Sequence, residues 1–309
     1  MAIAQLYHFN PNTMKTRPCG LVLFIGLVIF FASCKQGEKS GMAGGIDSIS
    51  LGDIKPLVHN IDSMGEGLPI FYNMYLSVEM SSLFQSSGAV FRQELLNTPD
   101  RMTNYITSSK KALNLGVYAV DLSYAKVSEQ LETAGKYFNA MQRMAEEMGI
   151  PSGYFKNTAD RFDRNIDNKD SLIKIANEVY MASDNYLREN ERYAASAQII
   201  LGGWVEAIYI ATNVASTTKD IGVIERLAEQ RVSLNNVIAM LNDYADDVDI
   251  KQNLYKLKQL QPLFDSFVVE VGSDFNPTSP DGKKIMQGYL LKINEIQKQI
   301  SQIRTEIVS

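Results

Sequence analysis

One acid inside an apolar segment is the residue of this sequence best placed to do chemistry. The stretch 194–217, "AASAQIILGGWVEAIYIATNVAST", is apolar on every side of a helix and carries a single charge, Glu206. A carboxylate in such a helix must be ion-paired, hydrogen-bonded or protonated, and a buried acid of this kind is a candidate for a functional site. Trp204 and Tyr209 lie near it and would line a ligand pocket with it. Alternatively, Glu206 faces solvent or pairs with a nearby Arg or Lys.

A second candidate is an acidic segment that imitates the opening of a calcium-binding EF-hand loop. Asp163, Asn165 and Asp167 place oxygen atoms at alternate positions, as that loop does. The sixth position, where the loop requires Gly, is Asn168, and the twelfth, where it requires Glu, is Lys174. We therefore predict no metal site, and interpret these acids as a solvated helical face.

A short apolar segment near the start of the chain has the layout of a targeting signal. The apolar run at 21–32 of "LVLFIGLVIFFASCKQ" has twelve residues, fewer than the roughly 20 that a helix needs to cross the hydrocarbon core. Lys15 and Arg17 precede it without any acidic residue, and small residues follow it. Basic, apolar and small residues in that order are typical of a secretory signal. We expect translation to begin at Met14, which gives the signal a conventional length.

The end of this segment, Phe31-Ala32-Ser33-Cys34, resembles the lipobox of bacterial lipoproteins. In that family a diacylglyceryl group is attached to the cysteine, the peptide is cut just before it, and the new amino terminus is usually acylated. The resemblance implies that residues 1–33 are a signal peptide, that cleavage separates Ser33 from Cys34, and that Cys34 holds the protein to a membrane. An ordinary signal peptide, or an uncleaved anchor with an incidental cysteine, is the alternative.

Loss of the signal would leave one cysteine and one histidine in the chain. Cys19 and His8 would leave with it, so that Cys34, carrying lipid, and His59 would be the last of their kinds. A thiol nucleophile, a disulfide and a two-histidine metal site are then excluded. The chain also lacks GxGxxG, GxxxxGK[ST], GxSxG, HExxH and CxxCH. We predict no catalytic residues, no cofactor and no enzymatic activity.

The charge of the chain argues against nucleic acid as a partner. The formal net charge is −5, and removal of Lys15 and Arg17 leaves 28 basic and 35 acidic residues, or −7. Binding to nucleic acid is driven largely by neutralisation of phosphates, which needs basic patches. No such patch is present in the sequence.

Composition divides the remaining chain into a tether and a body. Residues 34–53 are rich in Gly and Ser and poor in large apolar residues, which is typical of a flexible linker that reaches about 25 Å. Residues 54–309 are expected to form a helical domain, although length alone does not decide between one domain and two.

The body is predicted to be helical almost throughout. Apolar residues recur at alternating spacings of 4 and 3 from Leu113 to Met148, the pattern of one face of a long helix. Thr98-Pro99-Asp100 would begin that helix and Gly149 would end it, with Gly116 as a point where it could kink or divide.

Further helices are expected on the same grounds, and together they predict an all-α bundle of seven to nine helices. The 194–217 helix would be central because it is apolar all round, and Gly202-Gly203 would let another helix approach closely. Arg231 interrupts the apolar face of one expected helix, and Pro262 should break or kink another helix. Asp249 should cap a helix at Ile250, and Pro280 should begin the last helix. The run "FVVEV" at 267–271 is interpreted as a helix end. The remaining expected helices cover residues 69–86, 172–186, 224–241, 250–271 and 286–307.

Several phrases of the body, such as "LGVYAVDLSYAKV", "NIDNKDSL" and "IILGGWVEAIYIAT", are similar to uncharacterised helical lipoproteins of Bacteroidota-type bacteria. This resemblance covers most of 60–245; it implies a Gram-negative envelope and transfers no activity. Lys35 after the cysteine, where inner-membrane lipoproteins often have Asp, favours the outer membrane. Surface display in these bacteria is promoted by acids just after the cysteine; Glu38 alone is a weak version, so we expect the protein to face the periplasm.

Two functional classes follow from these observations. The first is a lipid-anchored interaction or structural module whose helical body contacts another envelope protein. The second is a ligand-binding lipoprotein with a pocket beside the 194–217 helix. A binder should have a cavity lined by Trp204, Tyr209 and Glu206, whereas a module should have those residues packed.

Overall fold

The computed structural model describes residues 84, 86–155, 160, 161, 164, 165, 175, 178, 182–272 and 274–309. All of these residues belong to one compact unit, Lys55–Ser309. The predicted signal peptide, Ser33, Cys34, the tether and His59 lie outside the described residues. So do most of the acidic segment at 157–171 and of the helices expected at 69–86 and 172–186.

The described residues form an all-α bundle without a strand, which confirms the predicted fold class. The α-helices that lie wholly within the described residues are α3 (Ser108–Val127), α4 (Leu131–Glu147), α7 (Tyr193–Thr218), α8 (Ile221–Ala228), α9 (Gln230–Asn242), α10 (Val248–Asp265) and α11 (Pro280–Val308). Residues 182–189 are also helical. Short 3-10 helices occur at η2 (Gln93–Leu95), η3 (Pro99–Asn104) and η4 (Ser152–Phe155).

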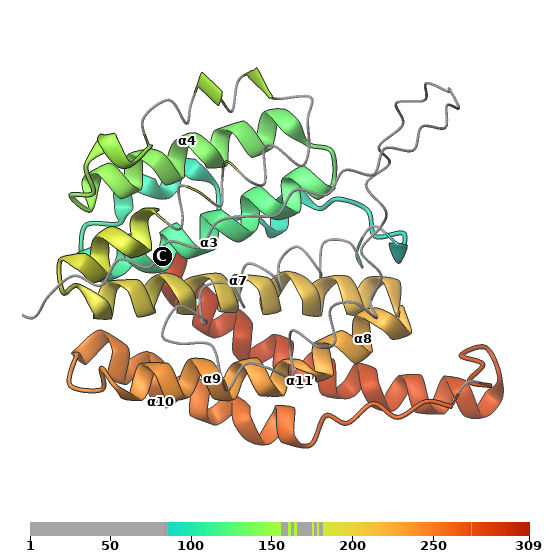
Figure 1. Ribbon diagram of the computed structural model, residues 1–309. Coiled ribbons are helices and arrows are strands. Elements are labelled where there is room, and N and C mark those ends of the chain that lie inside the picture. The colour runs from blue at the N-terminus through green and yellow to red at the C-terminus, as the bar shows by residue number, and fades with distance from the viewer. Residues whose placement is uncertain are drawn as a thin grey trace, which may run out of the picture. The chain divides into compact units, whose positions relative to one another are not determined.

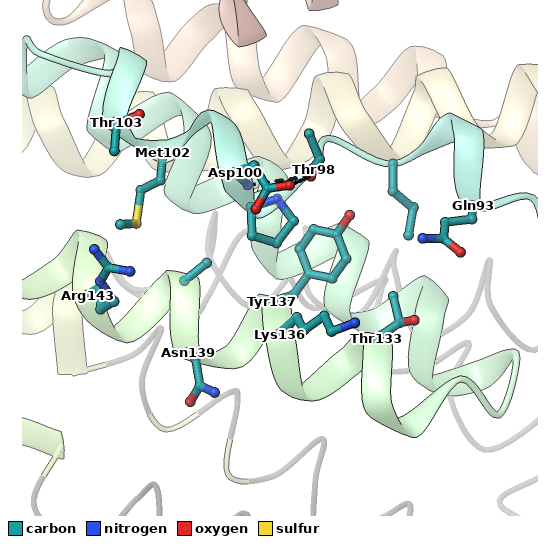
Figure 2. Close-up of a pocket in the computed structure, with 13 residues that line it drawn as sticks. Gln93, Thr98, Asp100, Met102, Thr103, Thr133, Lys136, Tyr137, Asn139 and Arg143 are labelled. Atoms are coloured by element: carbon teal, nitrogen blue, oxygen red, sulfur yellow. Dashed lines mark hydrogen bonds between the residues drawn. The ribbon is translucent and has the colours of Figure 1, made fainter.

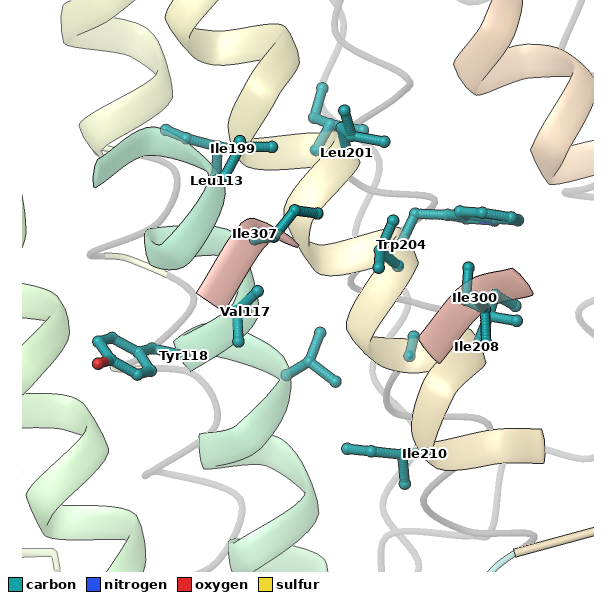
Figure 3. Close-up of a cluster of buried hydrophobic side chains, with 14 of the residues drawn as sticks. Leu113, Val117, Tyr118, Ile199, Leu201, Trp204, Ile208, Ile210, Ile300 and Ile307 are labelled. Carbon is teal, nitrogen blue, oxygen red and sulfur yellow. The ribbon is translucent and has the colours of Figure 1, made fainter. Parts of the chain in front are cut away.

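Helix α7 is the centre of the bundle, as its uniformly apolar sequence predicts. It packs on α3 on one side and on α9 and α8 on the other, while α4 covers α3 and α10 covers α9 and α11. Helix α11 crosses α7 diagonally, and its C-terminal end reaches α3 (Figure 1). Branched and aromatic side chains from α3, α7 and α11 interlock between these helices (Figure 3). Residues from three parts of the chain far apart in sequence therefore share one core.

Three glycines bring α3 and α7 into backbone contact. A Cβ atom at Gly116 would overlap the carbonyl oxygen of Ile199, and a Cβ atom at Gly202 would overlap that of Leu113. Gly203 is less crowded, because a Cβ atom there would lie 3.4 Å from the carbonyl oxygen of Gly116. The predicted close approach at Gly202-Gly203 is confirmed, and Gly116 serves as its counterpart on α3 instead of kinking or dividing that helix.

The prediction of one helix from Thr98 to Gly149 is wrong, because the chain reverses at Glu129. Glu129 adopts a left-handed conformation with φ of 62°. The amide of Gln130 donates to the carbonyl of Ala125 (2.8 Å) and that of Glu129 to Lys126 (2.9 Å), which is the Schellman pattern that ends helices. Helices α3 and α4 are thus a hairpin, and each turns its apolar stripe towards the core, so the sequence pattern continues across the break.

The expected start of that helix also differs. Thr98 caps the short helix η3, where its hydroxyl accepts from the amide of Asp100. Helix α3 begins later, with the side chain of Thr107 accepting from the amide of Lys110. At the other end, Gly149 has φ of 80° and ends α4 as predicted.

Several smaller expectations are corrected in the second half of the chain. The 224–241 segment, predicted to be one helix, is two helices, α8 and α9, which are divided at Glu229. Asp247, not Asp249, caps α10, since its carboxylate accepts from the amides of Asp249 and Ile250 at 3.0 Å. Helix α10 ends at Asp265 in the turn that contains Pro262, so 267–271 is neither helix nor strand. Pro280 begins α11 as predicted.

Candidate functional site

The buried acid Glu206 is neutralised by an arginine from the last helix. Its side chain is fully buried, and Arg304 of α11 donates from Nε and Nη2 to its two carboxylate oxygens at 2.8 Å each. Such a bidentate pair is the strongest arrangement available to an arginine and a carboxylate. The sequence-based alternative that Glu206 pairs with an Arg is the one that the structure adopts.

Arg304 also contacts two groups outside the ion pair. Its Nη2 donates to the carbonyl of Leu95 at 2.8 Å, and its guanidinium carbon lies 4.4 Å from the centre of the Tyr209 ring. Burial lowers the pKa of Arg304, but the charge and the hydrogen bonds of Glu206 outweigh burial and raise it above its ordinary value. The guanidinium therefore remains charged and links α11 to α7 and to the segment that precedes η3.

A second carboxyl group, Asp121 of α3, belongs to the same cluster. It is completely buried, and its Oδ2 accepts from the amide of Asn97 at 3.0 Å, while Oδ1 has no hydrogen-bond partner. Burial, and then the negative charge of Glu206, raise the pKa of Asp121 well above its ordinary value, although Arg304 acts in the opposite direction.

The cluster contains two carboxyl groups and one guanidinium in a dry interior. Two carboxyl groups that share a site do not ionise independently, because the negative charge of each opposes ionisation of the other. The raised pKa of Asp121 makes it the carboxyl group of this cluster that burial and the charge of Glu206 favour in the protonated form. The arrangement can hold and exchange one proton, and it has no nucleophile among its described members.

Polar groups extend this cluster towards the end of α11. The Nδ2 of Asn97 donates to the hydroxyl of Tyr105 (2.9 Å) and to Oδ1 of Asn114 (3.0 Å). Asn114 in turn donates to the carbonyl of Ile307 (2.9 Å), and Tyr105 to that of Val308 (3.3 Å). The last carbonyls of a helix have no partner within the helix, so α3 and its preceding segment supply the donors that the end of α11 needs.

Trp204 lies on a different face of α7 from Glu206 and Tyr209. Its side chain is fully buried, its Nε1 donates to the hydroxyl of Ser233 at 3.1 Å, and its ring lies 6.3 Å from that of Phe264. Tyr209 and Glu206 are brought together by Arg304, whereas Trp204 points towards α9 and α10. All three side chains have protein groups as partners, and their predicted use for a ligand stays a prediction.

Sequence reasoning singled out Glu206 but missed Asp121 and Arg304. The criterion that drew attention to Glu206, an acid in an apolar helix, also applies to Asp121 within "LGVYAVDLSYA". Arg304 lies four residues after Ile300 and three before Ile307, so it stands on the apolar face of α11. A basic residue on the apolar face of a helix indicates a buried ion pair, and this pattern could have identified Arg304 as the partner of Glu206.

A pocket lies next to this cluster, between α4 and the segment 93–103 (Figure 2). It has a volume of about 670 Å³. A shallower hollow of about 600 Å³ lies between residues 266–268 and the first turns of α11. Neither is lined by Trp204, Glu206 or Tyr209. Within the described part of the chain, no group of His, Cys, Asp and Glu side chains is arranged to hold a metal ion.

Among the described helices, α7 is the one that is long and apolar enough to cross a membrane, judged by length and composition alone. Its most apolar 18-residue window has a mean hydropathy of 1.3, and 89% of that window is buried within the bundle. Comparison of the chain with protein-family models, with curated proteins and with solved structures gives no match.

Proposed function

We propose that the protein is a lipid-anchored module of a bacterial envelope whose helical body contacts another envelope protein. One observation carries the part of this proposal that concerns the body: the groups that would serve a pocket beside α7 are used internally. Glu206 is held by Arg304, Trp204 donates to Ser233, and Tyr209 packs against the Arg304 guanidinium. A centre of this kind supports a structural role for α7, as expected of a module.

The proposed anchor rests on the sequence around Cys34. The basic residues, the twelve-residue apolar run and the cysteine that follows small residues agree with a lipoprotein signal. One acyl chain alone gives weak and reversible membrane binding, whereas several chains on one residue anchor a protein stably. Lys35 and the tether at 34–53 support an outer-membrane anchor with the body in the periplasm.

The two cysteines allow a matched test of the anchor. Cys34→Ser should abolish labelling of the protein by a palmitate analogue and move it from the membrane fraction to the soluble fraction. Cys19→Ser removes the other thiol within the expected signal and should leave labelling and partition unchanged. If Cys34→Ser is still labelled and still sediments with membranes, the proposed lipid anchor is wrong.

The proposed partner requires a separate measurement. The lipidated protein should be captured from native envelopes, with the Cys34→Ser protein as the control for nonspecific retention, and the retained material identified by mass spectrometry. An envelope protein enriched with the lipidated form is the expected result. A small molecule retained without any enriched protein would instead support the ligand-binding alternative.

A further inference from the structure

The pocket beside α4 has two walls that differ in chemistry. One wall is a stripe of α4 that carries Lys136, Tyr137, Ala140 and Arg143, and the other is the segment 93–103 (Figure 2). Leu96, Met102 and the Tyr137 ring are buried at its base. Hydroxyl and amide groups of exposed or partly exposed residues surround this base, namely Gln93, Thr98, Thr103, Thr133 and Asn139. The carboxylate of Asp100, on the 93–103 wall, also lines the pocket (Figure 2).

Tyr137 carries a polar group that the described chain does not use. The residue is only 3% exposed, and its hydroxyl makes no hydrogen bond within the described part of the protein. Its ring packs 5.7 Å from that of Tyr118, whose own hydroxyl donates to the carbonyl of Thr98 at 3.2 Å. The hydroxyl oxygen itself is not fully buried, so it can form a hydrogen bond with a molecule in the pocket.

The α4 wall also carries positive charge. Lys136 and Arg143 are seven residues apart, about 10 Å along a helix, and both are exposed. Lys136 pairs with Glu132 at 2.9 Å, but both side chains are largely in solvent, where such pairs contribute little. Arg143 makes no ion pair with any described residue. The opposite wall carries one negative charge, that of Asp100, whose carboxylate accepts from the Thr98 hydroxyl at 3.3 Å. A guanidinium that has no ion pair among the described residues is therefore the lining group suited to an anionic part of a ligand.

The opposite wall is held rigidly by the buried cluster. The amide of Asn97 is bound by Asp121, the carbonyl of Leu95 by Arg304, and the carbonyl of Thr98 by Tyr118. Three points of this short segment are therefore fixed to α3 and α11. A preformed wall lowers the entropy cost of binding a ligand.

We propose that this pocket binds a small molecule that has one anionic group and several hydroxyl groups, the chemistry of an acidic sugar or a sugar phosphate. Arg143 would bind the anionic group through paired N–H donors. The Tyr137 hydroxyl and the amide and hydroxyl groups of the walls would bind the ligand hydroxyls, and the apolar base would contact a sugar ring. The volume lies within the range of about 300 to 1,000 Å³ that small-molecule sites occupy. This site lies within the body and does not depend on the proposed anchor.

The proposal is tested with glucuronate, glucose 6-phosphate and glucose as probes of the full-length protein in detergent. Saturation-transfer NMR detects binding and calorimetric titration measures affinity. At least one anionic probe should bind, about tenfold or more tightly than glucose, and the two anionic probes distinguish a carboxylate from a phosphate ligand. If neither anionic probe binds, or if glucose binds equally well, the proposal is wrong.

Single substitutions test whether the probe binds in this pocket. Arg143→Gln should lower the affinity for the anionic probe by about tenfold, which is the contribution of one charge-assisted interaction. Arg231→Gln removes another exposed arginine, on α9, and should leave affinity for the probe unchanged. Tyr137→Phe keeps the ring but removes the hydroxyl, and it should lower the affinity for the probe several-fold. Equal effects of Arg143→Gln and Arg231→Gln would show that the attraction is general and that this pocket is not the site.

Discussion

At the scale of single residues, the least ordinary group is the carboxyl of Asp121. It shares the interior with Glu206, and one guanidinium, Arg304, serves both. Breaking such a pair from one side leaves an uncompensated charge, which typically costs about 3 to 5 kcal/mol. A proton on Asp121 would reduce such a cost, because the cluster would then contain one anion and one cation.

Asp121→Asn is expected to change how stability depends on pH. Since the pKa of Asp121 is raised in the folded protein, the native state binds more protons than the unfolded chain above about pH 4, the ordinary range of Asp. The free energy of unfolding therefore falls as pH rises from there towards the raised pKa, with a slope of about 1.4 kcal/mol per pH unit. The asparagine cannot ionise, so its free energy of unfolding should fall less steeply, as measured by urea denaturation at a series of pH values.

Asp246→Asn is the matched control for this measurement. Asp246 is exposed in the turn before α10, and its substitution should leave the pH dependence unchanged. A pH dependence of Asp121→Asn that parallels the wild type would show that Asp121 is ionised in the folded protein.

The sequence predicted one member of this cluster and not its partners. Glu206 is conspicuous because every neighbour along α7 is uncharged, so the need for a partner follows from composition. The identity of that partner depends on which of the chain's basic residues is brought near, and Arg304 is 98 residues away. Only the folded arrangement of α7 and α11 decides it.

At the scale of elements, α3 and α7 can cross closely because glycine has no Cβ atom. The backbones approach so closely at Gly116 and Gly202 that a methyl group would occupy the same space as a carbonyl oxygen of the facing helix. Glycine lowers helix propensity by up to about 1 kcal/mol relative to alanine. The packing of the core across this crossing offsets that cost.

Gly202→Ala is expected to destabilise the protein by about 3 kcal/mol or more, since backbone cannot move aside as a flexible side chain can. Gly288→Ala is the matched control, because Gly288 is also inside a helix and a Cβ atom there would meet nothing within 4 Å. That variant should gain about 0.5 to 1 kcal/mol from helix propensity alone. Urea denaturation measures both changes, and a Gly202→Ala protein as stable as the wild type would show that the crossing is looser than described.

The break between α3 and α4 shows what an apolar pattern leaves open. Its alternating spacing predicts which face of each helix is buried, and that face is buried in both. A hairpin preserves the pattern, because both helices turn the same stripe inwards. The reversal depends on Glu129 in a left-handed conformation. That conformation is usually adopted by Gly, so a glutamate at this position does not predict the end of a helix.

At the scale of the whole molecule, α7 makes the described helices one cooperative body. It contacts α3, α8, α9 and α11, and the polar network at the end of α11 joins residues nearly 200 positions apart. The sequence predicted this central position from the apolar composition of 194–217. It could not predict the order of the layers, which depends on contacts between distant segments.

The single tryptophan reports on this cooperativity. Trp204 is fully buried between α7, α9 and α10, so its fluorescence follows the core, whereas far-ultraviolet circular dichroism follows all helices. We expect both signals to have the same urea midpoint, as in a two-state transition. A tryptophan transition that precedes loss of helix would show that the core opens before the outer helices unfold.

The apolar character of α7 has a further consequence for a chain that is exported as proposed. Such a chain crosses the inner membrane before the bundle exists, and at that stage α7 is an unfolded segment long and apolar enough to be retained there. An ionisable residue near the middle of a segment opposes insertion into the bilayer by a few kcal/mol. Glu206 stands at that position, so the residue that joins α7 to α11 in the folded protein would also favour the passage of α7 during secretion.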